Sequence, residues 1–104
     1  MSMPNDYGCG CDMRGLLSFQ ILWLLSKKSM CGDSVAEEIG RRRGEKPKAG
    51  TIYPALKELR MGRLISGKKN GKTIVYSLTP KGVLVVRKAT RYFVHSFGDI
   101  ITTQ

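Results

Sequence analysis

The sequence predicts a mainly α-helical chain with one small β-hairpin, and three observations lead to this fold class. A helix-forming segment at Thr51–Met61 ends before a glycine. Two strand-forming runs, Leu64–Lys69 and Lys72–Leu78, flank Asn70-Gly71, a strong hairpin signal because both residues tolerate the positive φ of a type I′ turn. A longer helical pattern begins at Thr79-Pro80. Preceded by two further helices, this order is that of a winged helix-turn-helix with a long C-terminal dimerisation helix.

The net charge and the length of the chain indicate which kinds of molecule it binds. The 104 residues include 18 Lys and Arg against 8 Asp and Glu, a formal net charge of +10, which favours a polyanionic partner. The positive residues concentrate in 41–48, 57–72 and 81–91. A chain of this length forms one domain with a small core, so we also expect it to associate with a second copy.

The first helix is expected from Arg14 to Lys28, behind a Gly-, Pro- and Asn-rich segment, residues 1–12, that predicts a flexible N-terminal arm. Apolar residues occupy most of the helix circumference, which indicates burial on most sides. In a small domain two buried faces need two partners, the domain's own core and a second subunit. We therefore expect Leu17 and Trp23 at a dimer interface.

The second helix is expected to open with a capping box at Ser34 and to end at Arg41–Arg43, where cations suit the helix dipole. The third helix is expected to have Thr51 as its N-cap and Pro54 in its first turn, where a missing N–H costs little. Gly62 is the expected C-terminal stop.

The third helix and the hairpin together predict binding to double-stranded DNA through residues 13–79. The major groove admits one α-helix, and its base edges carry the full sequence code. Lysines on a hairpin suit phosphate or minor-groove contact, which adds affinity with little sequence information. The expected contact residues are Lys48, Thr51, Tyr53, Lys57, Arg60, Lys68, Lys69 and Lys72. The alternative is that these side chains form only a solvated surface.

Two of these residues have a second interpretation. Tyr53 either touches a phosphate or thymine methyl, or braces the third helix against the hairpin near Tyr76. Thr51 either caps the helix or donates to a phosphate, which a helix N-terminus attracts in any case.

The last helix, residues 80–104, begins with Thr79 as N-cap and Pro80 at its first position. Apolar or neutral residues recur along it in steps of three and four, a heptad seam. The seam residues are Val83, Val86, Thr90, Phe93, Phe97 and Ile100. Some 24 residues of helix extend about 36 Å, too far for one small domain to cover. The seam therefore predicts homodimerisation, the alternative being that it packs on its own domain.

No chemistry beyond binding is indicated. Cys9, Cys11, Cys31 and His95 match no common zinc spacing, so we expect no metal and no other cofactor. Neither a catalytic triad nor a carboxylate pair is visible, and we expect no enzymatic activity. The apolar run Leu16–Leu25 is about half the ~20 residues of a membrane span, and no signal-cleavage pattern follows it. We expect no membrane partner and a cytoplasmic protein.

The amino-acid sequence of three segments closely resembles that of the PadR family of transcriptional regulators. The segments are G-T-I-Y-P-A-L-K-E-L at 50–59, G-R-L-I at 62–65 and Y-S-L-T-P-K-G at 76–82. The resemblance implies a winged helix-turn-helix dimer, usually a repressor on a near-palindromic operator, that in some members releases DNA when a small phenolic or drug-like molecule binds. It places the recognition helix at Thr51–Met61 and the wing at Ile65–Leu78. Within the family, the chain resembles the short subclass, which has a single helix after the wing.

Three functions remain for the structure to weigh. The leading one is a dimeric, sequence-specific transcriptional regulator, a repressor. The second is a receptor that holds a small hydrophobic effector, a flat molecule between Trp23 and the seam aromatics Phe93 and Phe97. The third is an architectural nucleic-acid-binding protein that uses the same basic surface without sequence choice.

Overall fold

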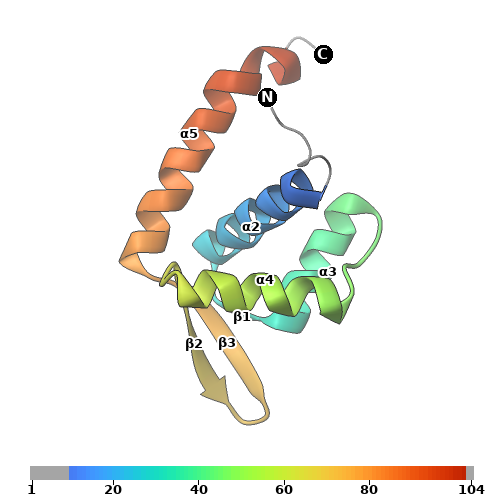
Figure 1. Cartoon of the computed structure of the whole chain (residues 1–104), viewed down its shortest axis with the longest axis vertical. Coiled ribbons are helices and arrows are strands. Elements are labelled where there is room, and N and C mark those ends of the chain that lie inside the picture. Colours follow the sequence, from blue (N-terminus) through green and yellow to red (C-terminus); the bar gives the residue numbers. More distant parts are fainter. Residues whose placement is uncertain (1–9, 103–104) are drawn as a thin grey trace.

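A computed structural model describes the backbone of residues 10–102 and the side chains of residues 15–96. The elements are α2 (Gly10–Lys27), β1 (Met30–Cys31), α3 (Gly32–Arg43), α4 (Ala49–Met61), β2 (Ile65–Asn70), β3 (Thr73–Leu78) and α5 (Pro80–Thr102). In Figure 1 α2, α3 and α4 pack together, the β2–β3 hairpin projects away from them, and α5 leaves the base of the hairpin and runs beside α2. The predicted fold, a mainly helical winged helix-turn-helix, is confirmed.

A third strand, absent from the sequence prediction, completes the sheet. The strand order is β1-β3-β2, with both pairs antiparallel. Met30 lies opposite Tyr76 and Cys31 opposite Val75, so β1 joins the α2–α3 connection to the hairpin. Two residues are too short a run to show a period of two, which is why the sequence pattern missed this strand.

The hairpin turn lies one residue later than predicted. Asn70 pairs with Thr73, so the two loop residues are Gly71 and Lys72. Gly71 has φ +67°, whereas Asn70 is not among the described residues of positive φ, and the expected type I′ turn is wrong. A two-residue loop with glycine first needs only one positive φ, so Asn70 stays in β2.

Two helices begin earlier than their predicted caps. α3 begins at Gly32 with Cys31 as N-cap, because the chain passes directly from β1 into the helix, and no side chain caps it. The capping box expected at Ser34 does not form. The first helix likewise starts at Gly10, inside the segment expected as an arm; residues 1–9 lie outside the described part of the chain.

α4 is also longer at its start than the sequence suggested. Its N-cap is Lys48, in an extended conformation, and the Lys48 carbonyl accepts the N–H groups of Thr51 at 2.9 Å and Ile52 at 3.0 Å. Thr51 therefore lies within the first turn and does not cap the helix. Pro54 moves to the second turn, where its ring removes the helical bond to the Gly50 carbonyl.

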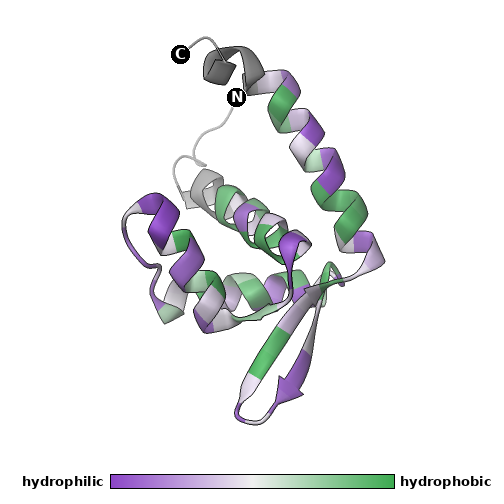
Figure 2. Ribbon diagram, turned by 180° about the vertical axis from the view of Figure 1, so that it is seen from behind, coloured by the Kyte–Doolittle hydropathy of each residue, from purple (hydrophilic) through white to green (hydrophobic). Residues whose placement is uncertain are grey.

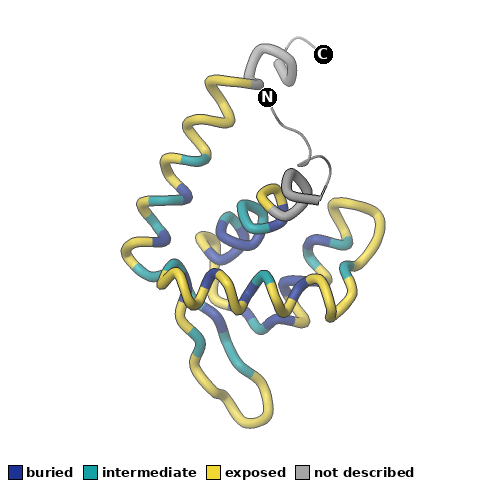
Figure 3. The backbone as a smooth tube through the Cα atoms, in the orientation of Figure 1, coloured by how far each residue is buried: buried dark blue, intermediate teal, exposed yellow. Residues whose placement is uncertain are grey.

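The core lies where α2, α3 and α4 meet beside the sheet, and Figure 2 shows apolar residues recurring along these helices. Burying each large apolar side chain there stabilises the fold by ~1.5–3 kcal/mol relative to exposure. The side chains with the least exposure are Ile21, Ile39, Ile52, Leu56 and Val35. Figure 3 shows that α5 joins the core only near its start and is exposed along most of its described length.

The end of α4 is bonded to the start of α5. Thr79 caps α5 as predicted, its Oγ1 accepting the Gly82 N–H at 3.0 Å. Gly82 lies so close to the turn after α4 that a Cβ atom there would stand 2.0 Å from the Leu64 carbonyl oxygen. Only glycine fits at this position.

We predict that Gly82→Ala lowers the free energy of unfolding by about 2–3 kcal/mol, because the backbone of Leu64 must move to admit the methyl group. Gly15→Ala is the matched control: Gly15 also lies in a helix, with no atom near the added Cβ, and should gain about 0.5–1 kcal/mol. Denaturant unfolding of the two variants measures both changes, and equal stability of the two would contradict the packing of α5 on the turn.

Candidate nucleic-acid interface

The exposed face of α4 carries the residues that the sequence assigned to DNA. Ile52, Leu56 and Leu59 are buried beneath the helix. At helical spacing on the other side, Tyr53, Lys57 and Arg60 are exposed, as their spacing predicted. Lys48 and Thr51, at the N-terminal end of the same helix, are exposed too.

The wing adjoins this face through a glycine. Gly67 lies opposite Tyr76 in the hairpin, and a Cβ atom on Gly67 would lie 3.2 Å from Cζ of Arg60. The missing side chain therefore leaves room for the Arg60 guanidinium against the strand. Together α4 and the wing enclose a shallow hollow of about 540 Å³. Its lining residues are Tyr53, Lys57, Arg60, Met61 and Tyr76.

Tyr53 lies against the start of the helix before it and lines two hollows beside the wing. A Cβ atom on Gly32, at the start of α3, would stand 2.8 Å from Cε1 of the Tyr53 ring. Tyr53 and Tyr76 line two hollows together. Tyr53 thus lies between α3 and the wing, and 44% of the residue stays exposed, where a partner can reach it.

The wing lysines point in more than one direction. Lys69 pairs with Ile74 two residues beyond the Gly67–Tyr76 pair, so it shares the face of the hairpin that turns to α4. Lys68 is on the opposite face, and Lys72 is in the loop. All three are exposed, and Figure 2 shows the hydrophilic tip that they form.

The arginines at the end of α3 are, by contrast, held by the protein itself. Arg41 and Arg42 both pair with Glu38, Arg42 at 3.0 Å. Arg43 donates through Nε to Gln20 Oε1 at 3.1 Å. These arginines therefore have partners within the chain, while their side chains stay at the surface.

Trp23 is covered by two cations. Lys27 Nζ lies 5.0 Å from the centre of the indole ring and Arg42 Cζ 5.3 Å from it, distances at which cations bind aromatic faces. Trp23 is half-buried against the core.

The residues expected at a dimer interface separate into groups. Leu17 and Val86 are buried in the chain's own core, at 3% and 5% exposure, so we revise the expectation for both. Val83 is half-buried and Thr90 exposed. Phe93 stacks on Phe19 with ring centres 6.2 Å apart. The side chains of Phe97 and Ile100 lie outside the described residues.

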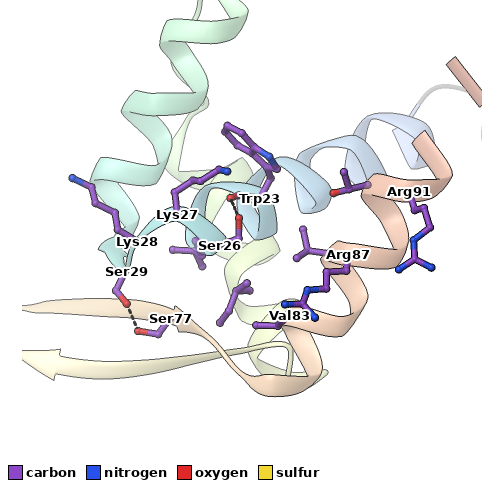
Figure 4. Close-up of a pocket in the computed structure, with 13 residues that line it drawn as sticks. Trp23, Ser26, Lys27, Lys28, Ser29, Ser77, Val83, Arg87 and Arg91 are labelled. Carbon is purple, nitrogen blue, oxygen red and sulfur yellow. Dashed lines mark hydrogen bonds between the residues drawn. The ribbon is translucent and has the colours of Figure 1, made fainter. Parts of the chain in front are cut away.

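A groove of about 760 Å³ separates the end of α2 from α5 (Figure 4). Its apolar floor includes Leu25, Leu78, Val83 and Val86, with Trp23 at the side. Four cations surround it without a carboxylate among the lining residues. They are Lys27, Lys28, Arg87 and Arg91. The pairing of Trp23 with Phe93 in one site is not seen, because Phe93 does not line the groove.

Cys31 is the one thiol within the described side chains. Its Sγ lies 3.4 Å from Ser34 Oγ, and the hydrogen bond from Ser34 lowers the pKa of the thiol below its ordinary value. Among the described residues no group of three His, Cys, Asp or Glu could hold a metal ion. Cys9 and Cys11 fall outside that range. No helix in the described part is long and apolar enough to cross a membrane.

The arrangement described so far, an exposed basic helix face beside a lysine-rich wing, can be compared with known families. The PadR-like family of transcriptional regulators matches residues 21–88, more than half of the chain. The chain belongs to this family. The match includes α3, α4 and the whole wing, which confirms the resemblance found in the sequence, and the members of this family are transcriptional regulators rather than enzymes.

Solved structures agree on the fold. A PadR family transcription regulator from Clostridium difficile is 25% identical with a TM-score of 0.70, over 84% of this chain and 95% of that one. A transcriptional regulator from Clostridium thermocellum is 20% identical with a TM-score of 0.76, over 89% and 97%. A PadR-like transcription factor from Bacteroides fragilis is 21% identical with a TM-score of 0.75, over 88% and 93%. No curated protein matches the chain.

Three residues of the interface were not assigned to it from the sequence. Met61 is 73% exposed at the end of α4 and lines the hollow beside Arg60. Gly67 makes the room for Arg60, and Tyr76 forms the wall on the wing side. A glycine within a strand signals close approach of another group, so Gly67 was detectable. Met61 was detectable too, because it lies four residues after Lys57 and therefore on the outward side of the helix.

Proposed function

We propose that this PadR-like regulator binds a near-palindromic operator in double-stranded DNA as a homodimer and represses transcription. The observation that carries the proposal is the continuity of the exposed face of α4 with the wing, joined at the hollow between Arg60 and Tyr76. Residues 13–79 act as the DNA-binding unit and residues 80–104 as the dimerisation helix. A regulator of this kind works beside the chromosome, in the cytoplasm.

In this proposal α4 enters the major groove. Lys57 and Arg60 reach base edges as donors, and the exposed Met61 offers an apolar surface to a thymine methyl group. Lys48 and Thr51, at the N-terminal end of α4, approach a phosphate, which the helix dipole favours. Lys68, Lys69 and Lys72 follow the adjacent backbone. Contacts from α4 therefore provide sequence specificity, and contacts from the wing provide affinity that does not depend on sequence.

We predict that Lys57→Ala weakens binding to the selected operator by about tenfold and binding to random duplex much less, because Lys57 lies on the groove-facing side of α4. The triple variant Lys68→Ala, Lys69→Ala and Lys72→Ala should weaken both duplexes alike and reduce the slope of log affinity against log salt by up to about 3. Titration of labelled duplexes at several salt concentrations measures both effects.

Two outcomes would contradict this division. Equal losses for Lys57→Ala on operator and random DNA would make Lys57 a phosphate contact, and an unchanged salt slope in the triple variant would exclude the wing as a phosphate clamp. A wild-type protein that binds random duplex as tightly as any selected sequence would instead support the architectural function, since specific regulators prefer their sites by ~10³-fold or more.

The proposed dimer rests on the long exposed stretch of α5. Its 23 residues extend about 34 Å, and the chain's own core covers only the first turns. Phe93 lies on Phe19 at the border of this stretch and is still 36% exposed. A second α5 across a two-fold axis would cover this surface and continue the seam to Phe97 and Ile100. Such symmetry places two recognition helices on half-sites about one DNA turn apart.

We predict that Phe97→Asp gives monomers and abolishes tight operator binding while the winged domain stays folded, because symmetry brings two like charges into one apolar interface. The loss per phenylalanine is ~2 kcal/mol. Leu84→Asp is the matched control, since Leu84 is 61% exposed on α5 but off the seam. Sedimentation and far-UV circular dichroism measure both variants. A dimeric Phe97→Asp protein would transfer the interface to α2.

A second candidate function, reception of a small effector, is favoured by the groove in Figure 4. Trp23 and the seam residues Val83, Val86 and Thr90 line it together, whereas the sequence interpretation placed Trp23 in such a site with Phe93 and Phe97. Its cationic rim adds a constraint that the sequence interpretation did not contain. A flat apolar molecule with a negative group fits this lining better than a neutral one of the same size.

We predict that phenylacetate quenches the fluorescence of Trp23 more strongly than phenylacetamide, and that Arg87→Gln removes the difference. The two compounds share their shape and differ in charge, so the comparison isolates the cationic rim. Lys88→Gln, which removes a charge outside the groove, is the control. Equal quenching by both compounds would exclude recognition of the charge.

A further inference from the structure

Three consecutive carbonyl groups after the recognition helix all point to the first turn of α5. Gly62 O accepts from Lys81 Nζ at 3.2 Å, and Leu64 O accepts the Thr79 N–H at 3.1 Å. Between them, Arg63 O accepts from Thr79 Oγ1 at 2.7 Å. We refer to residues 62–64 and 79–82 as the α4–α5 junction.

The turn that presents these carbonyls is itself closely defined. Arg63 has φ +63°, a left-handed conformation unusual for a residue with a side chain. Its N–H bonds to Arg60 O at 2.9 Å and the Leu64 N–H to Leu59 O at 3.0 Å, the pair of bonds that closes a helix in a Schellman motif. The carbonyl directions therefore follow the end of α4.

On the other side of the junction one hydroxyl serves two backbone groups. Thr79 Oγ1 donates to Arg63 O and accepts the Gly82 N–H at 3.0 Å, so the cap of α5 is also its tie to α4. Gly82 has no room for a Cβ atom against the Leu64 carbonyl. A change in the angle between the two helices would break these bonds or cause a backbone clash.

We propose that the α4–α5 junction sets the spacing of the half-sites that this regulator accepts, with Thr79 as the positioning residue. The inference rests on the proposed dimeric function. In a dimer held by α5, the direction in which α5 leaves α4 decides the distance and rotation between the two recognition helices. Each base pair of spacer shifts a half-site by about 3.4 Å along the DNA axis and also rotates it, so a rigid junction permits one spacing.

The experiment first selects an operator for the wild-type protein from a random-sequence duplex library, and then changes its central spacer by one base pair in either direction. Wild type should lose affinity on the order of tenfold on the shifted operators. Thr79→Val keeps the shape of the side chain without its hydroxyl. For this variant we expect a difference between spacings of less than about threefold. Thr79→Ser retains the hydroxyl and should restore the wild-type preference.

Lys81→Met tests the junction without touching the cap of α5, and it should broaden the accepted spacing in the same direction. Lys88→Met removes the same charge two turns further along α5 and should leave the preference unchanged. Sedimentation of each variant confirms that it is still a dimer. If Thr79→Val does not fold, the comparison of Lys81→Met with Lys88→Met decides alone.

The results separate the two proposals. If wild type selects no paired half-sites, the proposed function fails, and this inference fails with it. If wild type prefers one spacing, and dimeric Thr79→Val and Lys81→Met prefer it equally strongly, only the inference is overturned. A loss of affinity that is the same at every spacing would also overturn it, because it would show a structural role without an effect on geometry.

Discussion

The pairing of β3 with two neighbours is the interaction on which the presented surface depends. A two-stranded hairpin alone is marginally stable in water. Here β3 is the central strand, bonded to β2 on one side and to β1 on the other. Tyr76, opposite Met30, is only 6% exposed and belongs to the core. The wing is therefore an extension of the folded body, and its lysines have a fixed place relative to α4.

The β1 strand, which pairs with β3, also determines where α3 begins and how α3 meets α4. Because β1 ends at Cys31, α3 must begin at Gly32, and the absence of a side chain there admits the ring of Tyr53. Tyr53 then lies between the start of α3 and Tyr76 of the wing. One aromatic side chain of α4 thus lies against α3 and beside the sheet, and its exposed part belongs to the surface that we propose for DNA.

The positively charged side chains of the described residues have different surroundings. The arginines at the end of α3 pair with Glu38 and Gln20 or cover the indole of Trp23. Lys28, Arg87 and Arg91 lie around the groove between α2 and α5, and the cations of α4 and the wing lie together on one exposed surface, where a polyanion can reach them. A count of Lys and Arg could not separate these groups, because the distinction depends on which acidic or aromatic side chain the fold brings near each cation.

Local signals in the sequence determined the type and order of the larger elements. The stop at Gly62, the cap at Thr79 and the spacing of Tyr53, Lys57 and Arg60 on the outer face of α4 all depend on neighbours within a few residues, and the structure retains each of them.

Features decided by distant neighbours needed the tertiary structure. The pairing of β1 with β3 places the start of α3 at Gly32 and not at Ser34, and β1 itself, two residues long, shows no period in the sequence. Leu17 and Val86 had the pattern of interface residues but became core, because α2 and α5 of one chain lie side by side. Periodicity shows which residues need burial; only packing decides against what they are buried.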